Sequence, residues 1–138
     1  MRLPTMLVDI LGSLVRRPAT RQYPSAPSTP PPRLRGRVHW DPQRCTGCRL
    51  CVMDCPASAL ELFTLDKAAH RFVLRYDAAR CTFCSQCVES CNHGSIWQAN
   101  DEWELAGPDR QAFIAYYGAD DDVEQILAGE PQAAPSAE

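Results

Sequence analysis

Two groups of four cysteines constrain this 138-residue chain more than any other feature. All eight cysteines lie between positions 45 and 91, and both groups have the spacing C-x2-C-x2-C-x3-C. The groups are Cys45, Cys48, Cys51 and Cys55, and Cys81, Cys84, Cys87 and Cys91. A segment of about 60 residues has a small hydrophobic core, and such small domains usually depend on metal ions or disulfides. The fold is therefore expected to form around these thiols.

The spacing resembles the run that holds iron–sulfur clusters in two-cluster bacterial ferredoxins. Three cysteines separated by two residues let one tight loop wrap three corners of a four-iron cubane, and the fourth cysteine points away from that loop. In two-cluster proteins this fourth thiolate ligates the other cluster. The resemblance implies two [4Fe-4S] clusters as cofactors. Their expected ligands are Cys45, Cys48, Cys51 and Cys91 for cluster 1, and Cys81, Cys84, Cys87 and Cys55 for cluster 2.

Disulfides and zinc are the other common uses of eight cysteines. Disulfides would fit a secreted protein. The apolar stretch from Leu3 to Val15 is a poor export signal, however, because it carries Asp9 and no A-x-A-like cleavage site follows it. A reducing cytoplasmic compartment is therefore expected. Zinc sites prefer separated C-x2-C pairs, whereas here a third cysteine always follows two residues later. A zinc-binding interaction module is the alternative of another functional class.

Residues 1–17 are predicted to form an amphipathic helix that Pro18 ends. Apolar residues recur at three- and four-residue intervals, as one helical face requires; they are Leu3, Met6, Leu7, Ile10, Leu11, Leu14 and Val15. The stretch is shorter than the ~20 apolar residues of a membrane-spanning helix. Such a basic helix can lie on a membrane surface. It can equally pack on a partner subunit or fold onto its own domain, and these readings stay open.

Residues 18–37 are rich in proline and arginine, which predicts an extended, semi-rigid strap without a core of its own. Its prolines include Pro24, Pro27 and the run Pro30–Pro32. The basic residues are few and belong to no recognition motif, so nucleic-acid binding is not expected. Residues 1–37 carry a formal charge of +6, residues 38–98 are neutral and residues 99–138 carry −9. This asymmetry suggests that the two ends contact different surfaces.

Residues 38–98 contain an internal repeat with an offset of 36 residues, and each unit is expected to form a strand, a cysteine loop, a short helix and a second strand. Glu61–Leu65 and Arg71–Tyr76 alternate as two strands do, with a turn near Asp66. Two such units related by a pseudo-two-fold axis form the α+β sandwich of ferredoxins. The predicted fold class is therefore α+β, with the ferredoxin-like domain after the helix and the strap.

Residues 99–138 form a C-terminal extension. Residues 108–117 are predicted to form a short helix, and the acidic tail from about Gly129 has the composition of a disordered segment. The second cysteine group differs from the first in the residues that follow its last cysteine. Asn92 occupies the position that Pro56 has in the first group, and His93 comes next. His93 is expected to be an exposed loop residue, although a histidine there could couple electron and proton transfer.

Two flanking segments resemble those of a known family. Residues 31–37 read Pro-Pro-Arg-Leu-Arg-Gly-Arg, and residues 103–106 read Trp-Glu-Leu-Ala. Both are similar to the segments around the cysteine groups in the two-cluster iron–sulfur subunit of respiratory complex I. The same subunit type occurs in membrane-bound, energy-converting [NiFe] hydrogenases and formate hydrogenlyase complexes. The resemblance covers about residues 1–117, and the amino-acid sequence of the second cysteine group favours the hydrogenase branch.

The resemblance implies an electron-transfer subunit that relays electrons between other subunits of a membrane-associated oxidoreductase complex. It would lie peripherally on the cytoplasmic face of the cell membrane, where residues 1–17 could also touch lipid. No phosphate-binding glycine loop, activated nucleophile or nickel site appears in the sequence. Catalysis by the chain alone and a small-molecule substrate are therefore not expected. A free, soluble two-cluster ferredoxin is the alternative function within the same chemistry.

Overall fold

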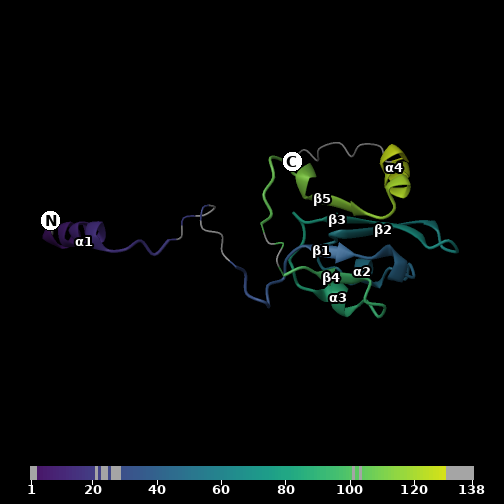
Figure 1. The fold of residues 1–138 in the computed structure, drawn as a ribbon, viewed down its shortest axis with the longest axis horizontal. Coiled ribbons are helices and arrows are strands. Elements are labelled where there is room, and N and C mark those ends of the chain that lie inside the picture. The colour runs from purple at the N-terminus through teal and green to yellow at the C-terminus, as the bar shows by residue number, and fades with distance from the viewer. Residues whose placement is uncertain are drawn as a thin grey trace.

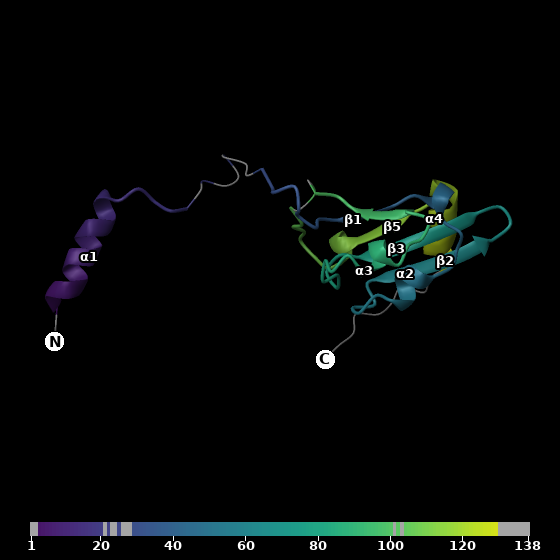
Figure 2. The same cartoon turned by 90° about the horizontal axis from the view of Figure 1, so that it is seen from below.

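The computed structural model describes residues 3–20, 22, 25, 29–100, 102 and 104–129. Helix α1 (Leu3–Val15) confirms the helix expected near the start of the chain, and it stands apart from the folded domain in both Figure 1 and Figure 2. More than half of each large apolar side chain described on it is exposed; these are Met6, Leu7, Val8, Ile10, Leu11, Leu14 and Val15. The helix therefore does not fold onto its own domain. Within the described residues, none of the helices combines the length and apolar character needed to cross a membrane.

The two repeat units fold as expected. The first unit contains β1 (Val38–Trp40), α2 (Leu50–Met53) and β2 (Leu60–Asp66). The second contains β3 (Arg71–Asp77), α3 (Gln86–Glu89) and β4 (Ile96–Gln98). In each unit the cysteine loop lies between the first strand and the short helix. The predicted strands at Glu61–Leu65 and Arg71–Tyr76 are confirmed within one residue at their ends.

Strand pairing joins the two units into one α+β domain. β1 of the first unit pairs antiparallel with β4 of the second, and β2 pairs antiparallel with β3. Because each sheet takes one strand from each unit, neither unit can close its core without the other. The core lies between the sheets and beneath the cysteine loops. Its buried side chains include Val38, Trp40, Leu60, Leu62, Phe72, Leu74, Tyr76 and Ile96, together with Cys45 and Cys87.

The C-terminal extension corrects one prediction. Instead of a helix over residues 108–117, the chain forms a short 3-10 turn (Gln111–Phe113) and then strand β5 (Ile114–Tyr117). β5 pairs antiparallel with β3 and makes the sheet three-stranded, in the order β2-β3-β5. The apolar and aromatic residues at 113–117 therefore meet a free strand edge, and pairing with that edge overrides the local helix pattern.

The extension ends in α4 (Asp120–Gly129), a helix that the sequence reading did not anticipate. Three consecutive aspartates lie in its first turn, where negative charge favours a helix N-terminus. Asp122 is buried and pairs with Arg71 of β3, which fastens the helix to the sheet. Several predictions fall on residues outside the described ranges. They concern Pro24, Pro27, Trp103 and the tail from residue 130.

Candidate metal centre

The two cysteine loops have the same backbone conformation. Each contains three residues with positive φ, and the members of each pair are 36 positions apart. The pairs are Gly47 and Phe83, Arg49 and Ser85, and Ser58 and Gly94, with φ between 47° and 70°. Left-handed residues reverse the chain within one or two positions, which is how a short loop can turn several N–H groups inward. A non-glycine residue pays a steric penalty there, so four such residues indicate that the surroundings impose the conformation.

Backbone N–H groups of both loops point at cysteine sulfur atoms in matching pairs. The N–H of Gly47 donates to Cys45 Sγ and the N–H of Phe83 donates to Cys81 Sγ, each with a donor–sulfur distance of 3.4 Å. The fourth cysteines receive equivalent bonds of 3.3 Å, from Ala59 to Cys55 and from Ser95 to Cys91. Donors aimed at sulfur stabilise the thiolate form, which is the form that ligates metal.

Several thiols lie close to thiols of the opposite cysteine group. Cys45 and Cys51 both lie close enough to Cys48 and Cys91 for the charges of these thiols to raise their pKa values. Around Cys87, the thiols that act in this way include Cys81, Cys84 and Cys55. Cys51 also acts on Cys87, so the two predicted ligand sets adjoin at this pair.

Burial differs systematically within each set. Burial raises the pKa of Cys51 to about 11 and that of Cys87 to about 12, and neighbouring thiols add to both shifts. Cys48 and Cys84, by contrast, are exposed. The pKa of Cys84 is lowered, chiefly by the backbone N–H of Gln86. Each set therefore has a partly or fully buried thiol close to the other set, Cys51 or Cys87, and an exposed thiol, Cys48 or Cys84.

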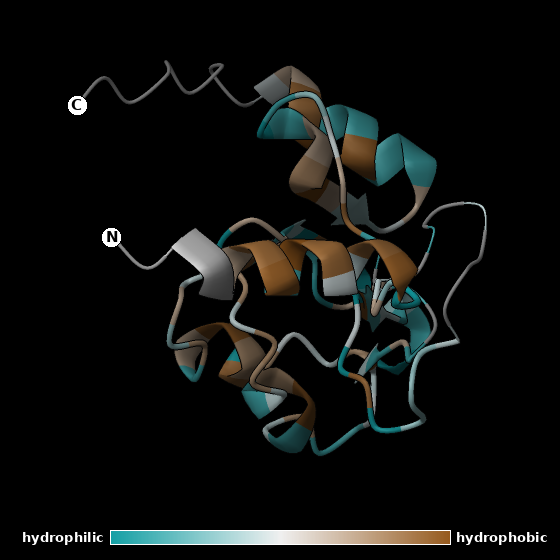
Figure 3. Ribbon diagram, turned by 90° about the vertical axis from the view of Figure 1, so that its left-hand side faces the viewer, coloured by the Kyte–Doolittle hydropathy of each residue, from teal (hydrophilic) through white to brown (hydrophobic). Residues whose placement is uncertain are grey.

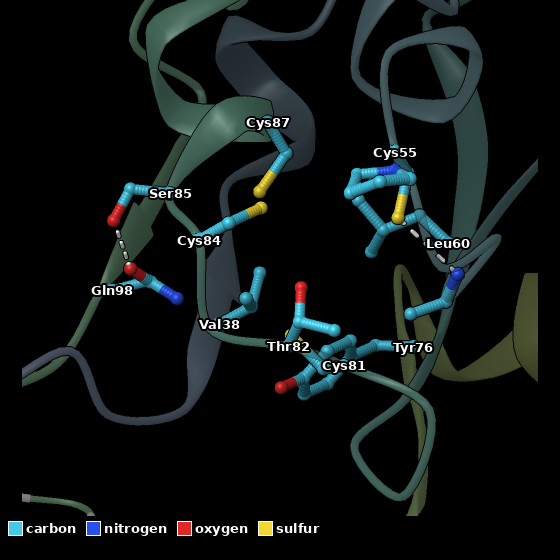
Figure 4. A pocket seen from close by; sticks show the side chains of 12 residues that line it. Val38, Cys55, Leu60, Tyr76, Cys81, Thr82, Cys84, Ser85, Cys87 and Gln98 are labelled. Carbon is cyan, nitrogen blue, oxygen red and sulfur yellow. Dashed lines mark hydrogen bonds between the residues drawn. The ribbon is translucent and has the colours of Figure 1, made fainter.

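The second set of thiols lines a pocket (Figure 4). In this view Cys84 and Cys87 lie side by side, and Cys55 faces them across the pocket. Among the described residues, no three Cys, His, Asp or Glu side chains converge on one point as the ligands of a single metal ion do. The sulfur atoms are instead spread around a wider space.

A buried hydroxyl beside this pocket tests whether the residues fit a cluster. Tyr76 lines the pocket and is fully buried, and its hydroxyl has no hydrogen-bond partner among the described residues. Leaving such a group unpaired costs about 1–3 kcal/mol. Burial raises the pKa of Tyr76, and the adjacent Cys81 raises it further. A cluster ligated by Cys81 would place acceptor sulfur atoms beside this hydroxyl, so the chain fits the group.

Sequence reasoning missed this aromatic donor and its counterpart. Trp40 lies 36 positions before Tyr76, and its side chain opposes the effect of burial on the pKa of Cys45. The repeat itself held the signal, because each unit places a polar aromatic residue at the end of its first strand. His93 is an exposed loop residue, as expected. The turn after Cys91 keeps the backbone hydrogen bond found after Cys55 (3.1 and 3.2 Å), although Asn92 replaces proline there.

The comparison with protein families agrees with this geometry. Residues 44–95, which include all eight cysteines, match the model of the 4Fe-4S dicluster domain. This segment therefore has the sequence pattern of a 4Fe-4S dicluster domain. Eight cysteines in this ferredoxin-like pattern provide the ligands for two [4Fe-4S] clusters, as the spacing predicted. The α+β ferredoxin-like fold class is likewise confirmed.

Curated relatives extend the match to a subunit type. The chain is 43% identical over 61 residues to NADH-quinone oxidoreductase subunit I of Pseudomonas paraeruginosa (strain DSM 24068 / PA7), covering 41% of this chain and 34% of the relative. It is 44% identical over 54 residues to NAD(P)H-quinone oxidoreductase subunit I of Prochlorococcus marinus (strain NATL1A), covering 36% and 25%. The chain thus spans about a quarter to a third of the length of these relatives, to which its dicluster domain is homologous.

One solved structure matches a larger share of the chain. It is a chain from the membrane-bound sulfane sulfur reductase, described as an archaeal respiratory membrane complex. The TM-score is 0.57 at 28% sequence identity, and the match covers 80% of this chain and 57% of the other. The resemblance inferred from the cysteine groups and their flanking segments is therefore supported at the level of both sequence and fold.

Proposed function

We propose that this chain is an electron-transfer subunit that relays electrons between other subunits of a membrane-associated oxidoreductase complex. The observation that carries the proposal is the arrangement of the thiols in two adjoining sets, each with an inner member (Cys51, partly buried, and Cys87, buried) and an exposed outer member. When bound, the two [4Fe-4S] clusters supply one-electron redox chemistry. The chain itself contributes the ligands, the N–H···S bonds and an apolar core that excludes water.

The exposure of the individual thiols suggests where electrons enter and leave the domain. Cys51 and Cys87 are the inner pair, where the two sets adjoin. Cys48 and Cys84 lie at the surface, where a partner protein can approach each set. A relay needs both features, because an electron must enter at one surface and leave at another. We therefore propose that Cys48 and Cys84 mark the two ends of the route.

The ligand exchange between the loops is part of the proposal. Cys91 completes the set of Cys45, Cys48 and Cys51, and Cys55 completes the set of Cys81, Cys84 and Cys87. Proximity of Cys91 to Cys45 and Cys51 supports this assignment. Replacing Cys91 by Ser should damage the cluster held by the first loop and spare the other. If electron paramagnetic resonance showed damage to the cluster of the second loop instead, the assignment would be wrong.

Helix α1 supports attachment to a membrane-bound assembly. Its described large apolar side chains are exposed, and much of the helix is brown, the hydrophobic colour, in Figure 3. Exposed apolar surface of this extent marks an interaction site. We propose that α1 docks on a membrane-embedded partner subunit at the cytoplasmic face, with lipid contact as a possible addition. Whether the parent complex belongs to the complex I or the hydrogenase branch stays a prediction.

A free, soluble ferredoxin is the second candidate, and co-purification separates the two. Full-length protein should be recovered with membrane-bound subunits from its native source, whereas a chain without residues 1–18 should be recovered free with both clusters intact. A full-length chain that is never found with other subunits would favour the soluble ferredoxin. Colourless, anaerobically purified protein with zinc and without iron or sulfide would reject both readings and favour the zinc module.

A further inference from the structure

The two fourth cysteines have matching backbone bonds but different side chains beside them. Cys55 and Cys91 each accept a backbone N–H from the residue four positions later, at 3.3 Å. That residue is Ala59 in the first unit and Ser95 in the second, and both are 3% exposed. The Ser95 hydroxyl lies 3.1 Å from Cys91 Sγ. Ala59 has no hydroxyl, so an equivalent side-chain bond to Cys55 cannot form.

The chemistry of ligation decides which atom donates. A cysteine that ligates iron is a thiolate, which has no proton to give. The Ser95 hydroxyl must therefore donate to Cys91 in the loaded protein. Since Ser95 is buried, water does not compete for this proton, and a hydrogen bond to a charged acceptor is stronger in such surroundings than in solvent.

We propose that Ser95 raises the midpoint potential of cluster 1 through an O–H···S bond to Cys91, while Ala59 leaves cluster 2 without that contribution. A reduced cluster carries one more negative charge than the oxidised form, so a donor to its ligand stabilises the reduced form more. Hydrogen bonds to sulfur are among the factors that set such potentials. Ser95 acts as a positioning and tuning residue, because its effect passes through Cys91. The inference rests on the proposed assignment of Cys91 to cluster 1.

The matched positions provide a reciprocal test on the full-length, cluster-loaded chain. Each cluster would be titrated anaerobically against potential and followed by electron paramagnetic resonance. At a fixed potential, Ser95→Ala should lower the ratio of reduced to oxidised cluster 1 by up to about tenfold, equivalent to 59 mV for one electron. Ala59→Ser should raise the same ratio for cluster 2. Ser95→Thr keeps the hydroxyl and should keep the potential near that of the parent.

Each cluster's electron paramagnetic resonance signal can be identified from a cysteine within its own loop, whichever cluster Cys91 ligates. Cys48→Ser should alter the signal of cluster 1, and Cys84→Ser that of cluster 2. A Ser95→Ala shift confined to the signal that Cys48→Ser alters supports the inference. A shift confined to the other signal would show that Cys91 is a local ligand, which overturns the assignment to cluster 1. Unchanged potentials in Ser95→Ala would refute the tuning, and absence of any cluster signal would refute the proposed function.

A spectroscopic measurement separates a hydrogen bond from a packing effect. In the parent and in Ser95→Thr, exchange into deuterated solvent should replace a strongly coupled proton near cluster 1, detectable by electron–nuclear double resonance. Ser95→Ala should lack this proton while keeping the backbone N–H bond to Cys91. The backbone N–H proton also exchanges, so the variants are compared with one another: exchangeable couplings in Ser95→Ala identical to those of the parent would mean that the hydroxyl is not the donor and would overturn the inference.

Discussion

Gly47 is the position where a single methyl group should disturb the first cysteine loop most. Its φ is +70°, and a Cβ built there would lie 2.6 Å from Cε1 and 2.9 Å from Cζ of Phe72. Phe72 is 1% exposed and belongs to the core, so its ring has little freedom to move away. Gly94 has a similar φ of +58°, but a Cβ there meets only the end of the Arg44 side chain, at 3.1 Å.

The two glycines separate backbone strain from lack of space. A left-handed alanine costs about 1–2 kcal/mol at either position. Crowding a packed core adds roughly 1–3 kcal/mol, and only Gly47→Ala should incur it. Because 1 kcal/mol corresponds to about 4–8 °C for a domain of this size, Gly47→Ala should melt at least ~4 °C below Gly94→Ala. The change in unfolded-chain entropy from glycine to alanine is common to both variants and cancels.

The assay is anaerobic thermal unfolding of cluster-loaded protein at one scan rate, followed by far-ultraviolet circular dichroism and by the visible absorption of the clusters. Phe83 occupies the matching position in the second loop with a φ of 52°, so the conformation itself tolerates a side chain. Adding Phe72→Leu to Gly47→Ala should recover stability relative to additive behaviour, by more than about 0.5 kcal/mol. Equal melting of the two alanine variants, or strict additivity with Phe72→Leu, would refute the argument.

Three further predictions concern the same core. Tyr76→Phe removes an unpaired buried hydroxyl, so the cluster-free chain should be as stable as the parent or more stable in differential scanning calorimetry. In the loaded protein the same change should speed the loss of cluster 2, measured as the rate at which its visible absorption bleaches. Asp77→Ala should destabilise by about 1.5–3 kcal/mol in denaturant titrations, and more than Arg110→Ala, because the buried Asp77 carboxylate also accepts the N–H of Ala79. Iron chelation should unfold much of the domain, seen as lost circular dichroism, because Cys45 and Cys87 belong to the core; a chain that stays folded would contradict this.

The repeat is the part of the structure that sequence reasoning predicted best. Identical cysteine spacing implied identical loops, and the backbone repeats at an offset of 36 residues down to individual hydrogen bonds. The bond from Met53 to Arg49, for example, recurs between Glu89 and Ser85. Prediction worked here because cluster ligation leaves little choice of backbone path, so the ligand spacing determines the loop conformation as well.

The structure of the C-terminal extension was predicted poorly because it depends on contacts with residues far away in the sequence. Residues 113–117 have an apolar pattern that suits a helix or a strand, and the free edge of β3 decides between them. The buried carboxylate of Asp122 is likewise explained by Arg71, which lies 51 positions earlier. Local propensity carries no information about a partner so distant in sequence, and α4 was missed for that reason.

The strap and the extension pair with each other beside the second cysteine loop. Backbone bonds join Gly36 to Ala99 and Arg37 to Glu102, so the strap is paired with the chain that leaves the domain. One residue earlier, the Arg35 guanidinium donates to the carbonyl of Cys84 and contributes to the lowered pKa of that thiol. The paired residues Gly36 and Arg37 thus adjoin the Arg35 contact at the exposed end of the proposed electron path, so a partner that bound this segment would also meet the surroundings of Cys84.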